Sequence, residues 1–479
     1  MGFFRRNYGL ILILILSFWA IRPLFTPGFF PIHDDTQVAR IFEMGKMLKS
    51  GVFPVRWVPD LGYGYGYPIF NFYAPLAYYA GGIFMLLGFD ALLATKIMMA
   101  LGVVLAGLSM YLLAKEFFGK LGGLISGLFY VYAPYHAVDI YVRGDVAEFY
   151  AYAFIPIMFL GIYKKSILMG SIGFAAIILS HNLTAMMVTP FLLVAILINY
   201  YVAFKEKKSF IINPSSLILV LGLALSAFYW IPALLEMKNT NVLSQIGGGA
   251  DFRDHFVCIP QLWDSLWGFG GSVAGCIDGL SFKIGKLHII GSLTALILMF
   301  IAMRNKNYNN YRYYILLVFA GFLISVFLML DVSRFVWEAI PIMAFFQYSW
   351  RFLILASFFS SLLAGYIIWF LKKPATYLSA IILIFFLLFY NLKLFNPQAI
   401  LSKTSEDYTS KRSLKWVASK ISDEFLPPNF NKPKSEYEVS KKPLPFTETN
   451  AQKISNLISF IGVLTLVVGI IVRYGTNKR

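Results

Sequence analysis

Charged residues are scarce in this sequence. Asp, Glu, Lys and Arg make up 14% of its 479 residues, whereas a soluble globular domain has roughly 25%. Hydrophobic residues make up 58%, and the mean hydropathy is +0.69. This composition excludes an ordinary soluble domain. Because apolar runs of about 20 residues recur from end to end, the sequence predicts an all-α polytopic membrane protein.

Cysteine is nearly absent, with only Cys258 and Cys276 in the chain. The charge pattern described below places both outside the membrane, where thiols are oxidised, so we expect a disulfide between them. Two unrelated free cysteines are the alternative.

A signal-peptidase cleavage site is also lacking, because no small-residue motif follows the first apolar run at 8–25. We therefore expect an uncleaved first membrane helix rather than a signal peptide.

The apolar runs predict about 12 transmembrane helices. They lie near residues 8–25, 91–113, 120–135, 149–163, 167–181, 184–204, 215–234, 286–303, 313–330, 351–371, 375–394 and 455–472. Segment 72–89 is also apolar, but counting it as a span would reverse every later loop. Its tyrosines and glycines suit a helix that lies in the membrane interface, and we assign it there.

The net charge of +17 comes from short basic clusters between the apolar runs. Clusters of this kind are typical of cytoplasmic loops, and their scatter argues against nucleic-acid binding. They fall in alternate loops, which predicts that both termini are cytoplasmic. The clusters are Arg5-Arg6, Lys115/Lys120, Lys164-Lys165, Lys205/Lys207-Lys208, Arg304/Lys306/Arg312, Lys372-Lys373 and Arg473/Lys478/Arg479.

The chain is predicted to divide into three parts. Residues 1–394 form the transmembrane domain. Residues 395–454, rich in Lys, Ser, Pro and Asn, form a small extracytoplasmic segment. Residues 455–479 form a final transmembrane helix and a cytoplasmic tail.

A first acidic motif, His33-Asp34-Asp35, stands early in the long first outer loop. Carboxylates are costly near a bilayer and often have a function there. Residues 38–48 follow with apolar positions near helical spacing, which predicts a short amphipathic helix on the membrane. The structural alternative is that Asp34 or Asp35 caps this helix.

A second acidic motif, at 143–148, lies in the short second outer loop. Asp145 and Glu148 are three residues apart and would share one face of a helix. Such a pair can bind a divalent cation or supply a general base. The alternative is that both are favourable charges at the start of the next helix.

A third polar stretch, Gln347-Tyr348-Ser349-Trp350-Arg351, begins another predicted helix. An arginine beside a tryptophan at the outer membrane surface suits phosphate recognition, because its planar group donates several hydrogen bonds. The alternative is an interfacial anchor.

With these motifs in place, the sequence resembles the GT-C glycosyltransferases, polytopic enzymes that use lipid-phosphate-linked sugars. In that family, acidic residues soon after the first helix are followed by amphipathic helices, two spans and a second acidic motif of Asp-x-Asp or Asp-x-Glu type. His33-Asp34-Asp35 matches the first position. The stretch 143–148 matches the second, but its spacing is Asp-x-x-Glu, which puts family-style metal binding in question.

A narrower resemblance is to the 6-pyruvoyl-tetrahydropterin synthase-related membrane proteins and the related YfhO-like proteins. It covers most of residues 1–355. The stretches that support it are Tyr67-Pro68-Ile69-Phe70-Asn71-Phe72, Ser180-His181-Asn182, Phe228-Tyr229-Trp230-Ile231-Pro232 and Gln347-Tyr348-Ser349-Trp350-Arg351.

The GT-C resemblance implies an inverting transfer of a sugar from a polyprenyl-phosphate donor to a glycan, lipid or protein acceptor, on the outer face of the plasma membrane. It implies a catalytic base in the first loop, Asp35 or else Asp34. The residues implied to support the acceptor or a metal are Asp145, Glu148 and His33. Those implied to bind the donor's lipid phosphate are Arg351, Lys286, His288, His181 and Arg143. A divalent cation, Mg²⁺ or Mn²⁺, would be held by Asp35, Asp145 and Glu148.

The rival hypothesis is a non-catalytic membrane protein: a transporter, a flippase for lipid-linked glycans or a scaffold. A transporter would usually show internal repeats and charges near mid-membrane, and we find no clear repeat. A further hypothesis is an oligosaccharide transferase of the same fold that acts on protein. The short polar segment at 395–454 argues against it, because such enzymes usually carry a large outer domain.

Overall fold

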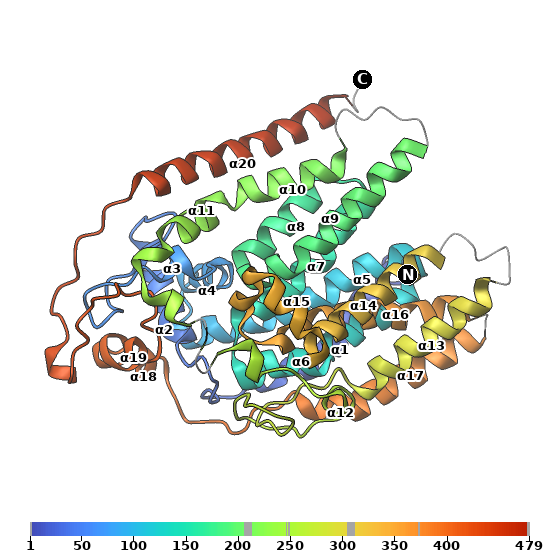
Figure 1. Cartoon of the computed structure of the whole chain (residues 1–479), viewed down its shortest axis with the longest axis horizontal. Coiled ribbons are helices and arrows are strands. Elements are labelled where there is room, and N and C mark those ends of the chain that lie inside the picture. The colour runs from blue at the N-terminus through green and yellow to red at the C-terminus, as the bar shows by residue number, and fades with distance from the viewer. Residues whose placement is uncertain are drawn as a thin grey trace. The chain divides into compact units, whose positions relative to one another are not determined.

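The computed structural model describes residues 2–205, 213–245, 247, 250–303, 312–371 and 374–476. It is built almost entirely of helices, and only isolated bridges join extended residues in the described part (Figure 1). The chain forms two compact units. Unit 1 comprises Met1–Asp34, Met99–Pro156 and Ile246–Lys403; unit 2 comprises Asp35–Met98, Ile157–Gln245 and Thr404–Arg479.

Unit 1 is organised around α16 (Leu353–Phe370), whose residues are buried along almost the whole helix. It packs against α13 (Lys286–Met303), α14 (Arg312–Met329) and α17 (Ala375–Asn391). The first helix, α1 (Gly2–Ile21), also belongs to this unit. Long apolar sequences favour these helices, because a helix satisfies all its backbone hydrogen bonds internally.

Unit 2 contains α8 (Ile167–Ser180), which packs against α10 (Pro214–Leu225). The final helix, α20 (Asn450–Thr476), runs beside α10 and α11 (Ala227–Glu236), as Figure 1 shows. The α10–α11 pair is bent by 66° at Ser226, where the predicted span 215–234 is broken.

All 12 predicted spans fall on helices. The runs 91–113 and 120–135 belong to one helix, α5 (Ala91–Val131), which has a non-helical backbone at Gly119. In the part of the chain that the structure describes, seven helices are long and apolar enough to cross a membrane by themselves, and the bent α10–α11 pair makes up to 8. α8, α13 and α14 include shorter apolar stretches. The chain is a multi-pass membrane protein of all-α fold.

The direction of the chain through the membrane stays a prediction, as does the cytoplasmic position of both termini. Several basic residues on which that prediction depends lie outside the described residues. They are Lys207, Lys208, Arg304, Lys306, Lys372, Lys373, Lys478 and Arg479.

Segment 72–89 contains α4 (Leu76–Leu86), a helix of 11 residues. At 1.5 Å per residue it is about 16 Å long, whereas a bilayer core is about 30 Å thick. α4 is therefore too short to cross a membrane. It packs within unit 2 against α2 (Gln37–Lys49), the amphipathic helix predicted after the first acidic motif.

The capping role considered for Asp34 or Asp35 is wrong. The N-cap residue of α2 is Thr36, which makes no side-chain cap hydrogen bond. This N-cap position lies one residue after Asp35 and two after Asp34, so neither aspartate is the N-cap residue of α2.

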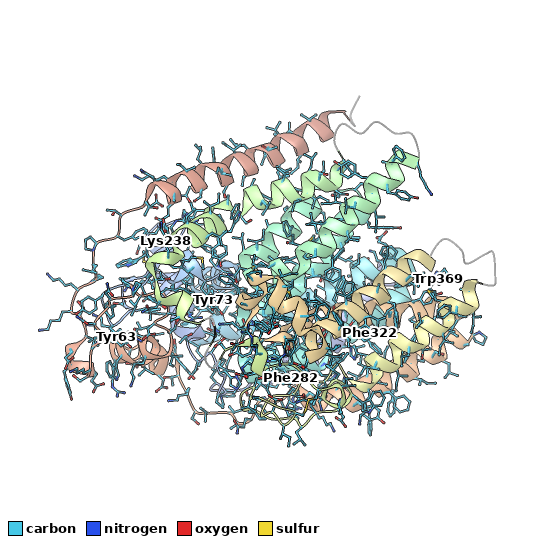
Figure 2. The ribbon with its side chains drawn as sticks, in the orientation of Figure 1. Tyr63, Tyr73, Lys238, Phe282, Phe322 and Trp369 are labelled. Carbon is cyan, nitrogen blue, oxygen red and sulfur yellow. A yellow bond between two sulfur atoms is a disulfide. The ribbon has the colours of Figure 1, made fainter. Side chains whose placement is uncertain are left out.

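The predicted disulfide is confirmed, since Cys258 and Cys276 are bonded with their Cα atoms 5.6 Å apart. The three-part division of the chain stays a prediction. Within unit 2, the polar segment after residue 404 packs on the first loop. The backbone N–H of Ser440 donates to the carbonyl of Tyr63 at 2.9 Å, and Tyr63 is labelled in Figure 2.

Candidate functional site

The second acidic motif lies in a break between two helices of unit 1. α6 (Pro134–Val138) continues into the π-helical turn η2 (Asp139–Arg143), and α7 (Val146–Tyr163) follows. Gly144 joins them with φ +64°, a left-handed conformation that favours glycine. A Cβ atom at Gly144 would lie 2.5 Å from the side chain of Ile32. Both the left-handed backbone and the close contact with Ile32 therefore favour glycine at position 144.

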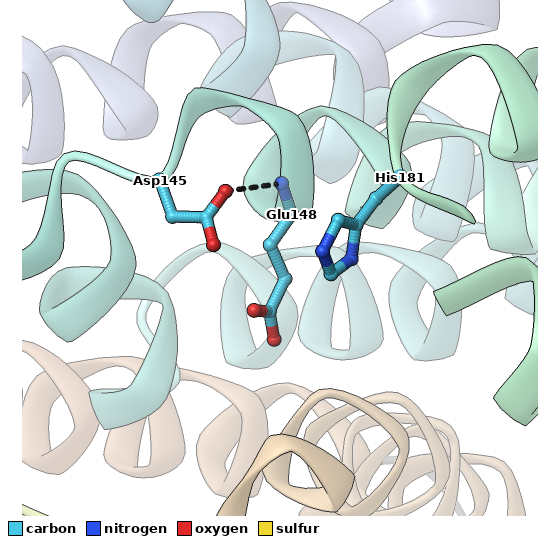
Figure 3. A group of neighbouring side chains, drawn as sticks. All are labelled: Asp145, Glu148 and His181. Carbon is cyan, nitrogen blue, oxygen red and sulfur yellow. Dashed lines mark hydrogen bonds between the residues drawn. The ribbon is translucent and has the colours of Figure 1, made fainter. Parts of the chain in front are cut away.

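Asp145 stands directly before α7 and caps it. Its Oδ1 accepts the backbone N–H of Glu148 at 3.0 Å, as Figure 3 shows. The structural interpretation of Asp145 as a helix-terminal charge is therefore correct. The same bond fixes Glu148 on the first turn of α7, so the two carboxylates lie on neighbouring positions of one surface. His181, also drawn in Figure 3, belongs to unit 2.

The arginine–carboxylate cluster comprises Asp139, Arg143, Asp145, Glu148 and Arg351, all buried in unit 1. Arg143 is its centre. Its Nη1 donates to Asp139 at 2.5 Å and to Glu148 at 2.7 Å, and its Nη2 donates to Asp145 at 2.7 Å. Charge-assisted bonds of this kind are the strong ones in protein interiors.

Tyr135 completes the surroundings of Glu148. Its hydroxyl donates to Glu148 Oε1 at 2.6 Å and accepts from Arg143 Nη1 at 3.1 Å. With this partner, both oxygens of Glu148 are hydrogen-bonded. A buried carboxylate needs such partners, because desolvation of an unpaired charge is costly.

Arg351 reaches the same carboxylates from the 3₁₀ turn η9 (Ser349–Phe352). Its Nη1 donates to Glu148 Oε2 at 3.1 Å and lies 3.8 Å from Asp145 Oδ2. Its Nε is buried and has no hydrogen-bond partner. Arg351 therefore differs from Arg143, because part of its guanidinium still has bonding capacity.

Trp350 separates the two arginines from the surrounding apolar core. The guanidinium carbon of Arg143 lies 4.8 Å from the centre of its ring, and that of Arg351 lies 5.8 Å away. Phe282, labelled in Figure 2, stacks on the indole with ring centroids 5.5 Å apart. A tryptophan face is favourable for a cation, so Trp350 helps to hold both arginines.

The first acidic motif is bonded to the second by its backbone. The N–H of His33 donates to the carbonyl of Val142 at 3.1 Å, and the N–H of Asp34 donates to the carbonyl of Arg143 at 3.0 Å. The side chain of His33 is 3.0 Å from the carbonyl of Phe269. The backbones of His33 and Asp34 thus meet the second motif inside unit 1.

Asp35, the predicted base, follows Asp34 directly and is the first residue of unit 2. In that unit it lies near Tyr408. Burial raises the pKa of the Tyr408 phenol, and the charge of Asp35 raises it further. Sequence patterns gave no sign of this tyrosine, because more than 370 positions separate the two residues.

The other predicted donor-binding residues have partners of their own. Lys286 donates to Asp264 at 2.6 Å. His288 is fully buried, and its Nε2 is 3.0 Å from the carbonyl of Phe129. In unit 2, His181 Nδ1 is 2.7 Å from Thr184 Oγ1. Their role in donor binding stays a prediction.

Sequence reasoning did not single out Asp139. The signal was present, because Asp139 and Arg143 are four residues apart and form an ion pair across one turn. Burial raises the pKa of Asp139, and Glu148 raises it further, while Arg143 opposes both effects. Its Oδ2 is buried without a hydrogen-bond partner.

A divalent cation, which the family resemblance implies, fits the ligand chemistry of this cluster. Asp145 and Glu148 offer the oxygen ligands that Mg²⁺ and Mn²⁺ prefer. The cluster has three carboxylates against two guanidinium groups, which leaves room for further positive charge. Both carboxylates already bond arginine, so a bound ion would share these oxygens with Arg143 and Arg351.

No family model matches the chain. A curated relative, an uncharacterized protein of Lactococcus lactis subsp. cremoris, is 25% identical over 243 residues. The match covers 48% of this chain and 40% of that protein, so the chain spans less than half the length of this relative. The narrower resemblance to the YfhO-like branch stays a prediction.

One solved structure has a similar fold, and a second is more distant. The apo oligosaccharyltransferase of Archaeoglobus fulgidus matches with a TM-score of 0.50 at 13% identity, over 94% of this chain and 62% of that one. ArnT from Cupriavidus metallidurans, solved with undecaprenyl phosphate, matches at a TM-score of 0.36 and 13% identity, over 75% of this chain and 78% of that one. The second likeness is too distant to bear on function. The first shows that this chain has a GT-C-type fold.

Proposed function

We propose that this membrane protein of GT-C fold is an inverting glycosyltransferase. It would move a sugar from a polyprenyl-phosphate-linked donor to an acceptor on the extracytoplasmic face of the plasma membrane. The observation that carries the proposal is the pair of backbone bonds from His33 and Asp34 to Val142 and Arg143. These bonds hold the backbone of Asp34, which directly precedes Asp35 in the chain, beside a buried cluster that contains an arginine with an unsatisfied donor.

Asp35 is the proposed base, and Asp34 is the second choice. The carboxylate takes the proton of the acceptor hydroxyl, and the acceptor oxygen forms a bond to the anomeric carbon of the sugar. The bond from that carbon to the phosphate oxygen breaks on the opposite face. The electron pair leaves with the lipid phosphate, and the configuration at the anomeric carbon inverts.

Arg351 is the proposed partner of the departing phosphate, because its buried Nε is a free donor. A donor that is already in place stabilises the charge that develops on the leaving group. Arg143 is a positioning residue, since its bonds to three carboxylates hold Asp145 and Glu148. We assign the support of the acceptor to those two carboxylates.

Where a divalent cation takes part, Asp145 and Glu148 would hold it, and the cation would supply positive charge for the leaving phosphate. The two carboxylates are kept apart and oriented by Arg143 and by the capping bond at the start of α7. This role of the protein is the same with or without the ion.

The proposal is tested with the full-length protein in proteoliposomes. Radiolabelled polyprenyl-phosphate sugars are supplied as donors together with an extract of cell-envelope glycans and lipids as acceptors, and transfer of the label to these acceptors is measured. We expect Asp35→Asn and Arg351→Ala each to reduce transfer at least 100-fold, on the scale of lost general-base or oxyanion-type stabilisation. The matched controls are Asp331→Asn and Arg334→Ala, which alter an exposed ion pair of the same unit.

Folding is checked in the same samples by thermal unfolding and by the elution volume in size-exclusion chromatography. Transfer that persists in both Asp35→Asn and Asp34→Asn contradicts the base assignment. Donor binding without transfer in the wild-type protein contradicts the enzymatic proposal and favours a flippase or scaffold.

A further inference from the structure

The disulfide loop, residues 258–284 of unit 1, exposes an unusual number of large apolar side chains. Leu266 is 77% exposed and Ile277 is 83% exposed. Three others are exposed in the same loop: Ile259, Trp263 and Val273. Soluble surfaces rarely gather such side chains, and where they do, the patch usually has a binding function.

Several polar side chains of the loop bond one another. Asp278 accepts from Gln261 Nε2 at 2.7 Å and from the backbone N–H of Val273 at 2.9 Å. Ser265 and Ser281 share a hydrogen bond of 2.8 Å between their hydroxyls. The bonding groups of these side chains are thus satisfied within the loop, while large apolar side chains beside them are exposed.

The loop is also held in one shape. Cys258 and Cys276 close it covalently. Two backbone hydrogen bonds connect residues 270–271 with Gly279. The N–H of Gly270 donates to the carbonyl of Gly279 at 2.9 Å, and the N–H of Gly279 donates to the carbonyl of Gly271 at 3.1 Å. The exposed apolar side chains are therefore presented by an ordered scaffold and cannot simply collapse inward.

The loop stands at the ends of membrane helices. Ile284 donates its backbone N–H to the carbonyl of Leu262 at 3.0 Å, two residues before α13 begins at Lys286. Within unit 1, α12 (Ile259–Trp263) of this loop lies beside the end of α17 (Figure 1), and Lys283 of the loop is close enough to Lys393, just after α17, for their charges to interact. Membrane helices end at the boundary between lipid and water.

Basic side chains accompany the apolar ones at that boundary. Lys283 and Lys286 both pair with Asp264, at 3.5 and 2.6 Å. Lysines with tryptophan and aliphatic side chains are the composition that suits an interfacial contact with anionic lipid.

We propose that the disulfide loop inserts its exposed apolar side chains, those of Ile259, Trp263, Leu266, Val273 and Ile277, into the lipid interface beside α13 and α17. The partner is the bilayer itself. The exposed Asp264 is paired with Lys283 and Lys286, and such a group of charges belongs at the water side of the interface. The inference is independent of the proposed glycosyl transfer.

The test places the photoreactive residue p-benzoylphenylalanine at Leu266 or Ile277 of the full-length protein in vesicles of phosphatidylcholine and phosphatidylglycerol. Tyr437 is the matched control, because it is 90% exposed and stands between two glutamates of a polar segment. After irradiation, mass spectrometry counts the lipid-adducted protein. We expect at least ten-fold more lipid adduct from Leu266 and Ile277 than from Tyr437.

Two outcomes would overturn the proposal. One is an equal yield of lipid adduct at all three positions. The other is a protein-to-protein adduct from Leu266 and Ile277 in place of the lipid adduct, which would make the face a protein interface. The substituted side chains are exposed, so folding is preserved, and the intact disulfide is verified by non-reducing electrophoresis.

Discussion

Each unit buries an arginine, Arg143 in unit 1 and Arg40 in unit 2, and the hydrogen-bond partners of the two arginines differ. In unit 1, Arg143 is surrounded by the carboxylates of Asp139, Asp145 and Glu148. In unit 2, the buried Arg40 donates to two hydroxyls, of Tyr78 at 3.2 Å and of Ser422 at 2.9 Å. Its guanidinium carbon lies 4.5 Å from the ring centre of Tyr73, which Figure 2 labels.

The difference matters because the two kinds of partner respond differently to a substitution. A hydroxyl or an aromatic ring that loses its arginine stays neutral. A buried carboxylate that loses its arginine stays charged, and an uncompensated buried charge is strongly destabilising. Unit 1 should therefore be far less tolerant of changes at its arginine centre than unit 2.

The largest effect is expected from Arg143→Met, which keeps most of the side-chain volume and removes the charge. It leaves three buried carboxylates with Arg351 alone, and we expect a loss of about 3–5 kcal/mol in the free energy of unfolding. Thermal unfolding of the protein in nanodiscs measures the change. Arg334→Met removes an exposed arginine as the control and should cost less than about 1 kcal/mol.

An equal loss of stability in Arg143→Met and Arg334→Met would show that the carboxylates of unit 1 are not held as ions by Arg143. The contrast between the units would then disappear.

The same contrast explains what the sequence could predict. Arg143 bonds residues two, four and five positions away, so its ion pairs are visible as a local pattern. Arg40 bonds Ser422, which is 382 positions away, and Arg56 bonds Asn456, 400 positions away. Periodicity and spacing contain no information on such pairs, because they depend on how the chain folds back.

The helices themselves were readable from composition, since each predicted apolar run forms a helix. The charge pattern of the loops predicted a common side of the membrane for the two acidic motifs, and that side stays a prediction. Asp139 was not singled out, although its spacing of four residues from Arg143 contained the signal. The bond between His33 and Phe269 was also beyond reach, because 236 positions separate them.

A second effect concerns Glu43, a buried carboxyl group of unit 2. Protonation neutralises Glu43, whereas Arg143 neutralises the carboxylates of Asp145 and Glu148 in unit 1. Burial and, to a lesser extent, the nearby Asp60 raise the pKa of Glu43 to about 8. The folded state thus favours the protonated form. This contribution to stability is full below the pKa of the unfolded chain and is lost as pH rises through about 8.

We therefore expect the wild-type protein to lose up to about 1.4 kcal/mol per pH unit between about pH 5 and 8. Glu43→Gln, which is neutral at every pH, should remove this slope. Thermal unfolding at pH 5, 6.5 and 8 measures it, and Glu406→Gln at an exposed position is the control. A slope that survives in Glu43→Gln would mean that Glu43 is ionised in the fold.

The smallest effect on the free energy of unfolding is expected when Arg40 or its hydroxyl partners are changed. Arg40→Met removes two hydrogen bonds and one cation–π contact, and we expect a loss of about 2–3 kcal/mol. Ser422→Ala removes one of these bonds, and the two changes in one chain should give a coupling energy of about 1 kcal/mol. Thermal unfolding of the wild type, both single variants and the double variant measures this energy.

The coupling energy is the quantity that separates the two units. For a bond between Arg40 and a neutral hydroxyl, we expect a coupling energy of about 1 kcal/mol. The hydroxyl of Ser422 also donates to Glu424, whose nearer carboxylate oxygen is 3.1 Å away. A coupling of 3 kcal/mol or more, the range of a broken buried ion pair, would mean that Glu424 acts through Ser422 as the true counter-ion of Arg40. Arg40 would then be neutralised by a carboxylate, as Arg143 is, with the hydroxyl of Ser422 between the two charged groups.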